Sequence, residues 1–104
     1  TSNVTNMSTM FRNAAAFDQD ISSWDFSSLN SSNSLLSFLE NAGLSTANYD
    51  ALLVRWGSQA SSMPSNMYNV NMGSSTYTSG SAAATARNTL VNTYGWSITD
   101  GGAV

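Results

Sequence analysis

A weak internal repeat constrains the fold of this chain more than any other feature of its sequence. At an offset of 25 residues, Val4 aligns with Leu29 and Met10 aligns with Leu35. The second copy is less regular than the first, as terminal repeats of a stacked array tend to be. A unit of this length is too short to bury its own apolar face, so it must pack against a neighbouring unit. The repeat therefore predicts a stack of short structural units.

Apolar spacing along the chain predicts alternating helices and short strands. In the first repeat, Met7, Met10, Phe11 and Ala14 follow the i, i+3, i+4, i+7 pattern of one helix face. Serine or threonine at the start and glycine at the end mark the two later helices. We expect helices over residues 7–14, 34–41, 45–57 and 81–94, and strands over 21–26, 67–72 and 96–99. This alternation is typical of a right-handed α/β coil with a parallel sheet at its edge.

A chain of 104 residues is expected to form one domain, spanning 1–104. Residues 1–43 hold the two repeats, the second degenerate, and residues 44–104 form a longer unit that is expected to cap the C-terminal side of the stack. The residues expected to fill the core are Phe11, Phe17, Ile21, Trp24, Leu29, Leu35, Leu36, Leu39, Leu52, Leu53, Trp56, Leu90, Trp96 and Ile98.

The N-terminal side of the stack is expected to stay open, because no capping unit precedes the first repeat. A stack without a polar cap exposes apolar side chains and unpaired backbone groups. Val4, Met7 and Met10 are therefore expected to line an interaction edge. Either further repeats or another molecule would cover that edge.

The surface of the folded chain is expected to be polar but almost uncharged. Charged residues make up 9% of the sequence, whereas serine, threonine and asparagine supply roughly four residues in ten. Three arginines, the absence of lysine and a formal net charge of −3 leave no basic stripe for a nucleic acid. No apolar run approaches the roughly 20 residues of a membrane span, so we expect no membrane insertion.

The absence of histidine and cysteine excludes serine triads, thiol proteases and the usual zinc sites. We therefore expect no enzymatic activity and no cofactor. Paired carboxylates for glycoside hydrolysis are a distant alternative, since nothing in the sequence places two of them across a cleft. The six carboxylate side chains of the sequence are Asp18, Asp20, Asp25, Glu40, Asp50 and Asp100.

Three of these carboxylates lie close together in the sequence and are candidates for calcium. Asp18, Asp20 and Asp25 would offer the hard oxygen ligands that calcium prefers. The stretch lacks the glycine and the distant bidentate glutamate of a helix-loop-helix calcium site. The favoured interpretation is that Asp18 and Asp20 bond backbone amides in the turn before Ile21. Four tyrosines are candidates for stacking on sugars, although their spacing suits the core equally well, at Tyr49, Tyr68, Tyr77 and Tyr94.

The amino-acid sequence of the first repeat resembles that of a known family. Residues 2–14 and 17–25 closely resemble the 25- to 26-residue repeat of the BspA-like leucine-rich-repeat family of bacterial surface proteins. Residues 44–56 resemble the segment that follows the last repeat in many of those proteins, and residues 95–102 resemble that region's ending. One departure is Thr78, where many relatives carry a cysteine, so stabilisation at that point is expected to come from packing.

This resemblance implies a leucine-rich-repeat-like solenoid, a secreted or cell-surface location, and a role in adhesion or partner binding without catalysis. The expected function is a module that binds a host or cell-surface protein or glycan through a face rich in hydroxyl and amide groups. The alternative is a structural subunit whose copies stack head to tail into an extracellular filament, in which case its partners are other copies of itself. A carbohydrate-active enzyme is a distant third.

Overall fold

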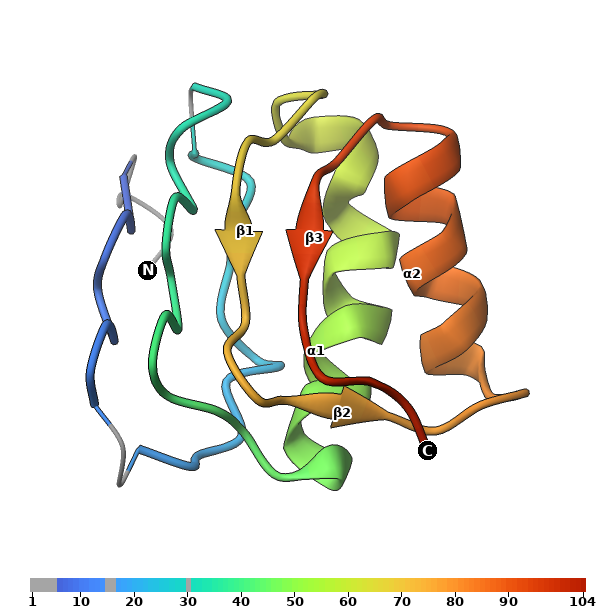
Figure 1. Ribbon diagram of the computed structural model, residues 1–104. Helices are drawn as coiled ribbons and strands as arrows, with labels where there is room; N and C mark the ends of the chain where they lie inside the picture. The colour runs from blue at the N-terminus through green and yellow to red at the C-terminus, as the bar shows by residue number, and fades with distance from the viewer. Residues whose placement is uncertain (1–5, 15–16, 30) are drawn as a thin grey trace.

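The computed structural model describes residues 6–14, 17–29 and 31–104. In these ranges the chain forms helices α1 (Thr46–Gln59) and α2 (Ala82–Asn92), joined in sequence by strands of two residues each (Figure 1). A single turn of 3₁₀ helix, η1, follows α1. The short elements are η1 (Ala60–Ser62), β1 (Val70–Asn71), β2 (Thr76–Tyr77), β3 (Ile98–Thr99) and β4 (Gly102–Ala103). Strand β1 pairs in parallel with β3, and β2 pairs in parallel with β4.

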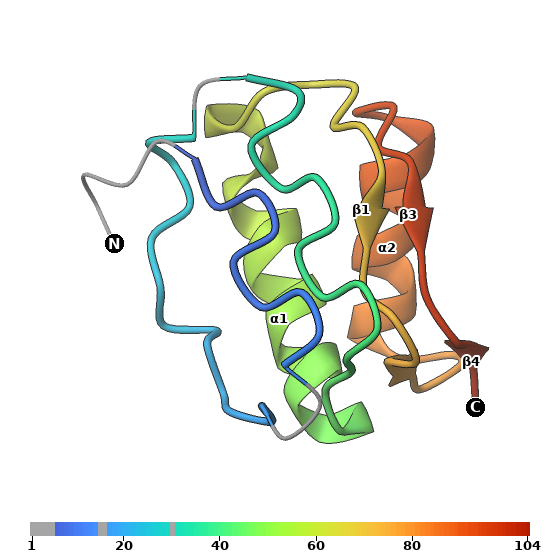
Figure 2. The same cartoon turned by 60° about the vertical axis from the view of Figure 1, so that its left-hand side comes forward.

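Four extended segments lie side by side in one direction on the face opposite the helices. We name them row 1 (6–14), row 2 (32–42), row 3 (66–73) and row 4 (94–100); β1 lies in row 3 and β3 in row 4. Backbone hydrogen bonds join each row to the next, and Figures 1 and 2 show the rows in the order 1, 2, 3, 4. Rows 1 and 2 lie in front of α1 in Figure 2. The layers of the fold are therefore a sheet-like stack of rows and a pair of helices.

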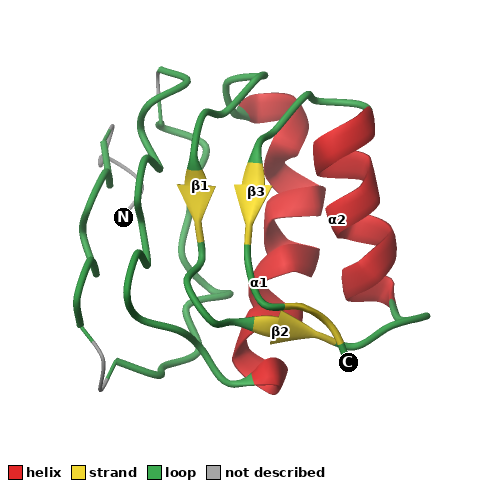
Figure 3. Cartoon of the chain, in the orientation of Figure 1, coloured by secondary structure: helices red, strands yellow, loops and turns green. Residues whose placement is uncertain are grey.

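Rows 1 and 2 are chains of turns, so the helices expected over 7–14 and 34–41 are wrong. In row 1, Met10 donates its N–H to the carbonyl of Met7, three residues back, while Phe11 donates to row 2. Figure 3 draws both rows as loop. Left-handed backbone conformations interrupt any helix, because φ is positive at Thr9 and Asn13, as it is at the matching positions of row 2. Short polar side chains favour such turns by bonding nearby backbone groups.

The spacing between the first two rows also differs from the 25-residue alignment. Met7 donates its N–H to the carbonyl of Ser34 at 2.7 Å, and Phe11 donates to that of Phe38 at 3.0 Å. Because the donor in a parallel ladder pairs with the residue after its acceptor, as Val70 does with Ile98, Met7 pairs with Leu35 at an offset of 28 residues. The 25-residue alignment matches side chains of an expected helix face in the two copies, whereas in the structure backbone hydrogen bonds set the alignment of the two rows. The repeat therefore locates the two rows but not their register.

The two helices form where capping residues and apolar stripes coincide. The hydroxyl of Ser45 accepts from the third amide of α1, and Ser81 does the same for α2. Helix α1 continues two residues past Gly57, contrary to the expected end, because this glycine lies against Ala86 of α2 and packing offsets its roughly 1 kcal/mol propensity cost. Helix α2 ends at Asn92, two residues earlier than expected.

The expected strands are shorter in the structure. Residues 21–26 hold a turn and no strand, and within the expected strands 67–72 and 96–99 only Val70–Asn71 and Ile98–Thr99 form a ladder. Tyr68 is exposed while Val70 is buried, so the two do not share a side as they would in a regular strand over 67–72. Asn69 lies between them with φ of 48°, which breaks the two-residue period.

A single apolar cluster fills the space between rows and helices. Four of the expected core residues, Phe11, Phe17, Trp24 and Ile98, are partly buried against it, and Leu36 is half-exposed on row 2. The cluster also holds side chains that the sequence analysis did not select, among them Met7, Phe26, Phe38, Tyr49 and Met67. The expected core residues that are fully buried are Ile21, Leu29, Leu35, Leu39, Leu52, Leu53, Trp56, Leu90 and Trp96.

The indole of Trp56 is the centre of this cluster. Its ring centroid lies 5.7 Å from that of Phe26, 6.1 Å from that of Phe38 and 5.6 Å from that of Trp96. These partners come from the segment between rows 1 and 2, from row 2 and from row 4. One side chain of α1 thus contacts three different segments of the fold.

Of the helices in the described ranges, none is long and apolar enough to cross a membrane.

Candidate functional site

The exposed side chains of the four rows form a surface of amide and hydroxyl groups, which we call the row surface. Its charges are Arg12 and Glu40, which pair across rows 1 and 2 at 2.6 Å and so cancel. An exposed ion pair of this kind adds little stability, but it leaves the surface neutral. The exposed residues of the row surface are Asn6, Thr9, Met10, Arg12, Asn13, Ser32, Asn33, Asn41, Asn66, Tyr68, Gly95, Ser97 and Thr99.

Side chains on neighbouring rows bond to one another and fix their positions on the row surface. The amide of Asn41 donates to the side-chain oxygen of Asn13 at 2.9 Å. Between rows 2 and 3, the amide of Asn69 donates to the hydroxyl of Ser37 at 3.4 Å. The first bond lies on the row surface, because Asn13 and Asn41 are both exposed, whereas Ser37 in the second bond is only 8% exposed.

Tyr68 is the aromatic side chain that the row surface presents. It is 60% exposed, whereas Tyr49 is fully buried and Tyr77 and Tyr94 pack against the core. Its backbone is fixed, because its N–H donates to the carbonyl of Ser32 at 2.7 Å. Of the four tyrosines that are candidates for stacking on sugars, Tyr68 is the one that is exposed to solvent.

The structure changes the interaction edge expected at row 1. Met7 is 1% exposed and lies in the core, because its backbone bond to Ser34 holds row 1 against row 2 with this side chain beneath. Met10 is 43% exposed and stays available. Val4 lies outside the described residues.

The three calcium candidates are not brought together, and the expectation that Asp18 bonds the turn before Ile21 is wrong, because its carboxylate bonds the start of α1. Asp18 accepts from the backbone of Ser45 at 2.8 Å and from the side chain of Asn48 at 2.9 Å, and these bonds lower the pKa of Asp18. Asp20 accepts from the N–H two residues on, at 2.9 Å, and so does Asp25. Serine hydroxyls and amides lower the pKa values of Asp20 and Asp25 as well. Among the residues that the structure describes, no three carboxylates, histidines or cysteines gather into a metal-binding group.

A buried polar cluster near the C-terminus escaped the sequence analysis. Asp100 accepts from the hydroxyl of Tyr49 at 2.6 Å and from Nε of Arg87 at 2.8 Å. The guanidinium of Arg87 also lies 5.1 Å from the ring centroid of Tyr77. Burial raises the pKa of Tyr49, and the hydrogen bond to Asp100 raises it further. The cluster ties row 4 to both helices, which is a structural role, and its members lie too far apart in sequence to form a motif.

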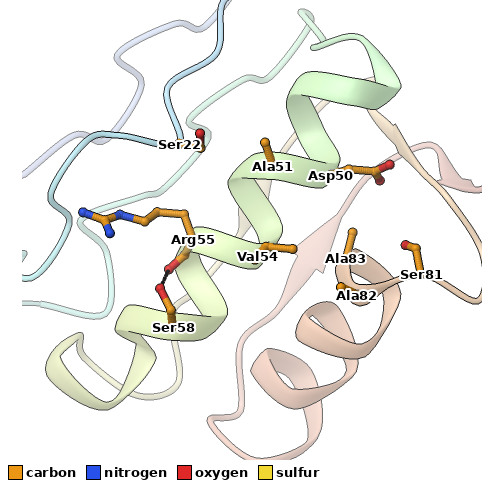
Figure 4. Close-up of a pocket in the computed structure, with 9 residues that line it drawn as sticks. All are labelled: Ser22, Asp50, Ala51, Val54, Arg55, Ser58, Ser81, Ala82 and Ala83. Carbon is orange, nitrogen blue, oxygen red and sulfur yellow. Dashed lines mark hydrogen bonds between the residues drawn. The ribbon is translucent and has the colours of Figure 1, made fainter.

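An open groove of about 570 Å³ runs over the outer face of α1 (Figure 4). Val54, which is 44% exposed, lies on its floor between Ser22 and the start of α2. Arg55 at one side donates to the carbonyl of Trp24 at 3.0 Å. The groove is lined by Ser22, Asp50, Ala51, Val54, Arg55, Ser58, Ser81, Ala82 and Ala83.

Asp50, at the other side of the groove, corrects the expectation for Thr78. It accepts from the N–H of Thr78 at 2.9 Å and from its hydroxyl at 2.7 Å. Stabilisation at Thr78 therefore comes from hydrogen bonds to a carboxylate, and the expectation of packing alone is wrong. Asp50 is the carboxylate among the residues that line this groove, so the groove does not hold the carboxylate pair of a glycosidase.

One family model matches the part of the chain that contains rows 1 to 3 and α1. Residues 1–78 match the model of a family described as "Mycoplasma protein of unknown function, DUF285". The chain belongs to DUF285. No curated protein and no solved structure matches it. Most of the row surface of this DUF285 protein, including Tyr68, lies within the matched region, whereas α2 and row 4, with Arg87 and Asp100, follow it.

Proposed function

We propose that this DUF285 protein is a non-catalytic recognition module that binds a neutral glycan through its row surface. The observation that carries the proposal is the exposed ring of Tyr68 on a surface whose other exposed side chains are mostly amides and hydroxyls. An aromatic ring packs against the apolar face of a sugar, and amides bond its hydroxyls through paired donor and acceptor atoms. A neutral surface binds such a ligand without the cost of desolvating an unpaired charge.

The proposal extends to a BspA-like, leucine-rich-repeat-like right-handed solenoid on a secreted or cell-surface protein. Two observations support it. The first is the resemblance of residues 2–14 and 17–25 to the repeat of that family. The second is the parallel hydrogen bonding of four rows with helices on the other face. Adhesion through a repeated polar face is consistent with both.

Glycan-array screening followed by calorimetric titration of each bound glycan tests the proposal. Tyr68→Ala is expected to weaken binding roughly tenfold, which corresponds to the upper end of the energy of an aromatic contact. Tyr68→Phe keeps the ring and is expected to bind nearly as well as the unchanged protein.

Val54→Ala is the matched control, because Val54 is also exposed but lies in the groove over α1. It is expected to leave glycan binding unchanged. A protein that binds no glycan, or whose Tyr68→Ala variant binds as well as the unchanged chain, overturns the proposal.

A further inference from the structure

Most hydrogen bonds between the rows run in the same direction along the stack. Each row donates alternate N–H groups to carbonyls of the next row, as Leu39 does to Asn71 at 2.8 Å. A few bonds run the other way, such as that from Tyr68 to Ser32. The stack therefore has a polarity, with donors directed towards the C-terminal neighbour and acceptors towards the N-terminal neighbour.

Row 1 consequently presents a line of acceptors on its outer edge. Alternate N–H groups from Thr9 to Asn13 donate to row 2. In a trans peptide the carbonyl points opposite to the N–H of the same peptide group, and the described chain has no cis peptide bond. The carbonyls of Ser8, Met10 and Arg12 therefore point away from row 2. None of them accepts a backbone N–H from the residues that the structure describes, and the carbonyl of Ser8 accepts the hydroxyl of Thr9 at 2.7 Å, which leaves its second lone pair.

Row 4 presents the matching donors at the other end of the stack. The carbonyl of Ser97 accepts from row 3 at 2.9 Å, and that of Thr99 accepts from row 3 at 2.7 Å. The N–H groups of the same two peptides belong to Ile98 and Asp100, so they point away from row 3. These donors are two residues apart, which is also the spacing of the acceptors on row 1.

Neither edge carries the charges that usually prevent strand edges from pairing. Row 4 has no charged side chain before Asp100, whose carboxylate is held inward by Arg87. On row 1 the charge of Arg12 is paired with Glu40, and the neighbouring Met10 is exposed and apolar. Natural edge strands are commonly protected by lysine or proline, and neither residue occurs in row 1 or row 4.

We propose that copies of this chain associate head to tail, with row 4 of one copy docking in parallel on row 1 of the next. Ile98 and Asp100 donate their N–H groups to two successive carbonyls among those of Ser8, Met10 and Arg12. Two acceptor edges cannot bond one another, so the contact is not a closed twofold dimer. Each added copy keeps one free donor edge and one free acceptor edge, and association is therefore open-ended. The row surface stays accessible in such a chain, so this inference does not depend on glycan binding.

Sedimentation velocity over a range of concentrations tests the contact in the unchanged protein. The mean mass is expected to rise continuously past that of a dimer. Met10→Lys places a charge at the acceptor edge and is expected to raise the dissociation constant at least tenfold. Val54→Lys is the control, because Val54 is 44% exposed and Met10 is 43% exposed, but Val54 lies on α1. It is expected to associate like the unchanged chain.

A mixing experiment distinguishes this contact from other modes of association. Ile98→Pro removes the outward N–H from the donor edge, and Thr99→Lys is the second variant for that edge if the proline variant does not fold. Each edge variant alone is expected to be monomeric. Mixed with Met10→Lys, the donor-edge variant is expected to form a 1:1 dimer that grows no further, because each partner supplies one intact edge.

Several results would overturn the head-to-tail contact. They are a monomer at every concentration, a closed dimer of the unchanged protein, equal association of Met10→Lys and the unchanged chain, and failure of folded edge variants to pair when mixed.

Discussion

Asp50 accepts two hydrogen bonds from Thr78, one from its backbone N–H at 2.9 Å and one from its hydroxyl at 2.7 Å. The pair joins the middle of α1 to the residue that follows β2. It anchors the connection that leads into α2.

Removal of the Thr78 hydroxyl is expected to destabilise the protein. Thr78→Val keeps the shape and the backbone bond but loses the bond from the hydroxyl to Asp50. We expect the free energy of unfolding to fall by about 1 kcal/mol, and Thr78→Ser to restore most of it. Urea titrations followed by circular dichroism measure the difference. Equal stability of the valine variant and the unchanged chain would show that the side-chain bond contributes nothing.

The Asp100 cluster predicts a decline of stability at high pH. The raised pKa of Tyr49 means that the folded state holds its proton more tightly than the unfolded chain does, where the ordinary value is 10.0. This contribution is fully present below pH 10 and is lost as the pH rises above it. We expect the free energy of unfolding to fall by about 1.4 kcal/mol per pH unit there. Tyr49→Phe is expected to remove this dependence in urea titrations between neutral and alkaline pH.

Breaking the ion pair in the same cluster tests its structural role. Asp100→Asn leaves the guanidinium of Arg87 without its carboxylate, and the side chain of Arg87 is only 21% exposed. We expect a loss of about 2–3 kcal/mol, less than for a fully buried pair. Arg12→Gln on the exposed pair with Glu40 is the control and is expected to cost well under 1 kcal/mol. Similar costs for the two variants would contradict the assignment.

The carboxylate of Asp18 predicts how the stability changes in acid. Hydrogen bonds from Ser45 and Asn48 lower the pKa of Asp18 below its ordinary value of 3.8. The stability that this group contributes is present above that pH and is lost as the pH falls through the lowered pKa. Asp18→Asn is expected to flatten the acid limb of the unfolding curve. An acid limb that is unchanged by the substitution would show that Asp18 is not the group responsible.

Two glycines with similar backbone angles predict different costs of substitution. Gly73 has φ of 61° and Gly80 has φ of 70°. A Cβ at Gly73 would overlap the carbonyl oxygen of Ala42, whereas a Cβ at Gly80 would meet no atom within 4 Å. Gly80→Ala is expected to cost about 1 kcal/mol for its left-handed backbone, and Gly73→Ala clearly more. Thermal denaturation of the two variants measures the difference, and equal midpoints would be contrary to the packing of row 3 on row 2.

The helices were predictable because their signals are local. Ser45 and Ser81 are N-cap residues ahead of apolar stripes, and both caps are present in the structure. The conformation of rows 1 and 2 was not predictable, because the spacing of Met7, Met10 and Phe11 matches a helix face as well as a chain of turns. The conformation is set instead by left-handed residues such as Asn13. Asparagine at that position was the available signal.

The candidate site was predictable in its chemistry but not in its geometry. The composition indicated a neutral surface of amides and hydroxyls, and the structure shows which of these side chains the rows expose. The selection of Tyr68 among four tyrosines depends on the positive φ of Asn69, which turns the side chain out of the core period. The interaction edge assigned to Met7 failed for a similar reason, because its orientation follows from pairing with row 2. Bonds between distant residues decide these outcomes, as they do for Tyr49 and Asp100.

The position of Trp56 has a consequence for how the molecule comes apart. In an array whose layers touch only their immediate neighbours, the outer layers can peel away while the rest stays folded. Here the indole of Trp56 is enclosed by the segment after row 1, by row 2 and by row 4. Unfolding of any one of these segments would therefore expose that indole to water. Unfolding of one segment and unfolding of the whole protein are therefore coupled. Tryptophan fluorescence should report a single transition from folded to unfolded.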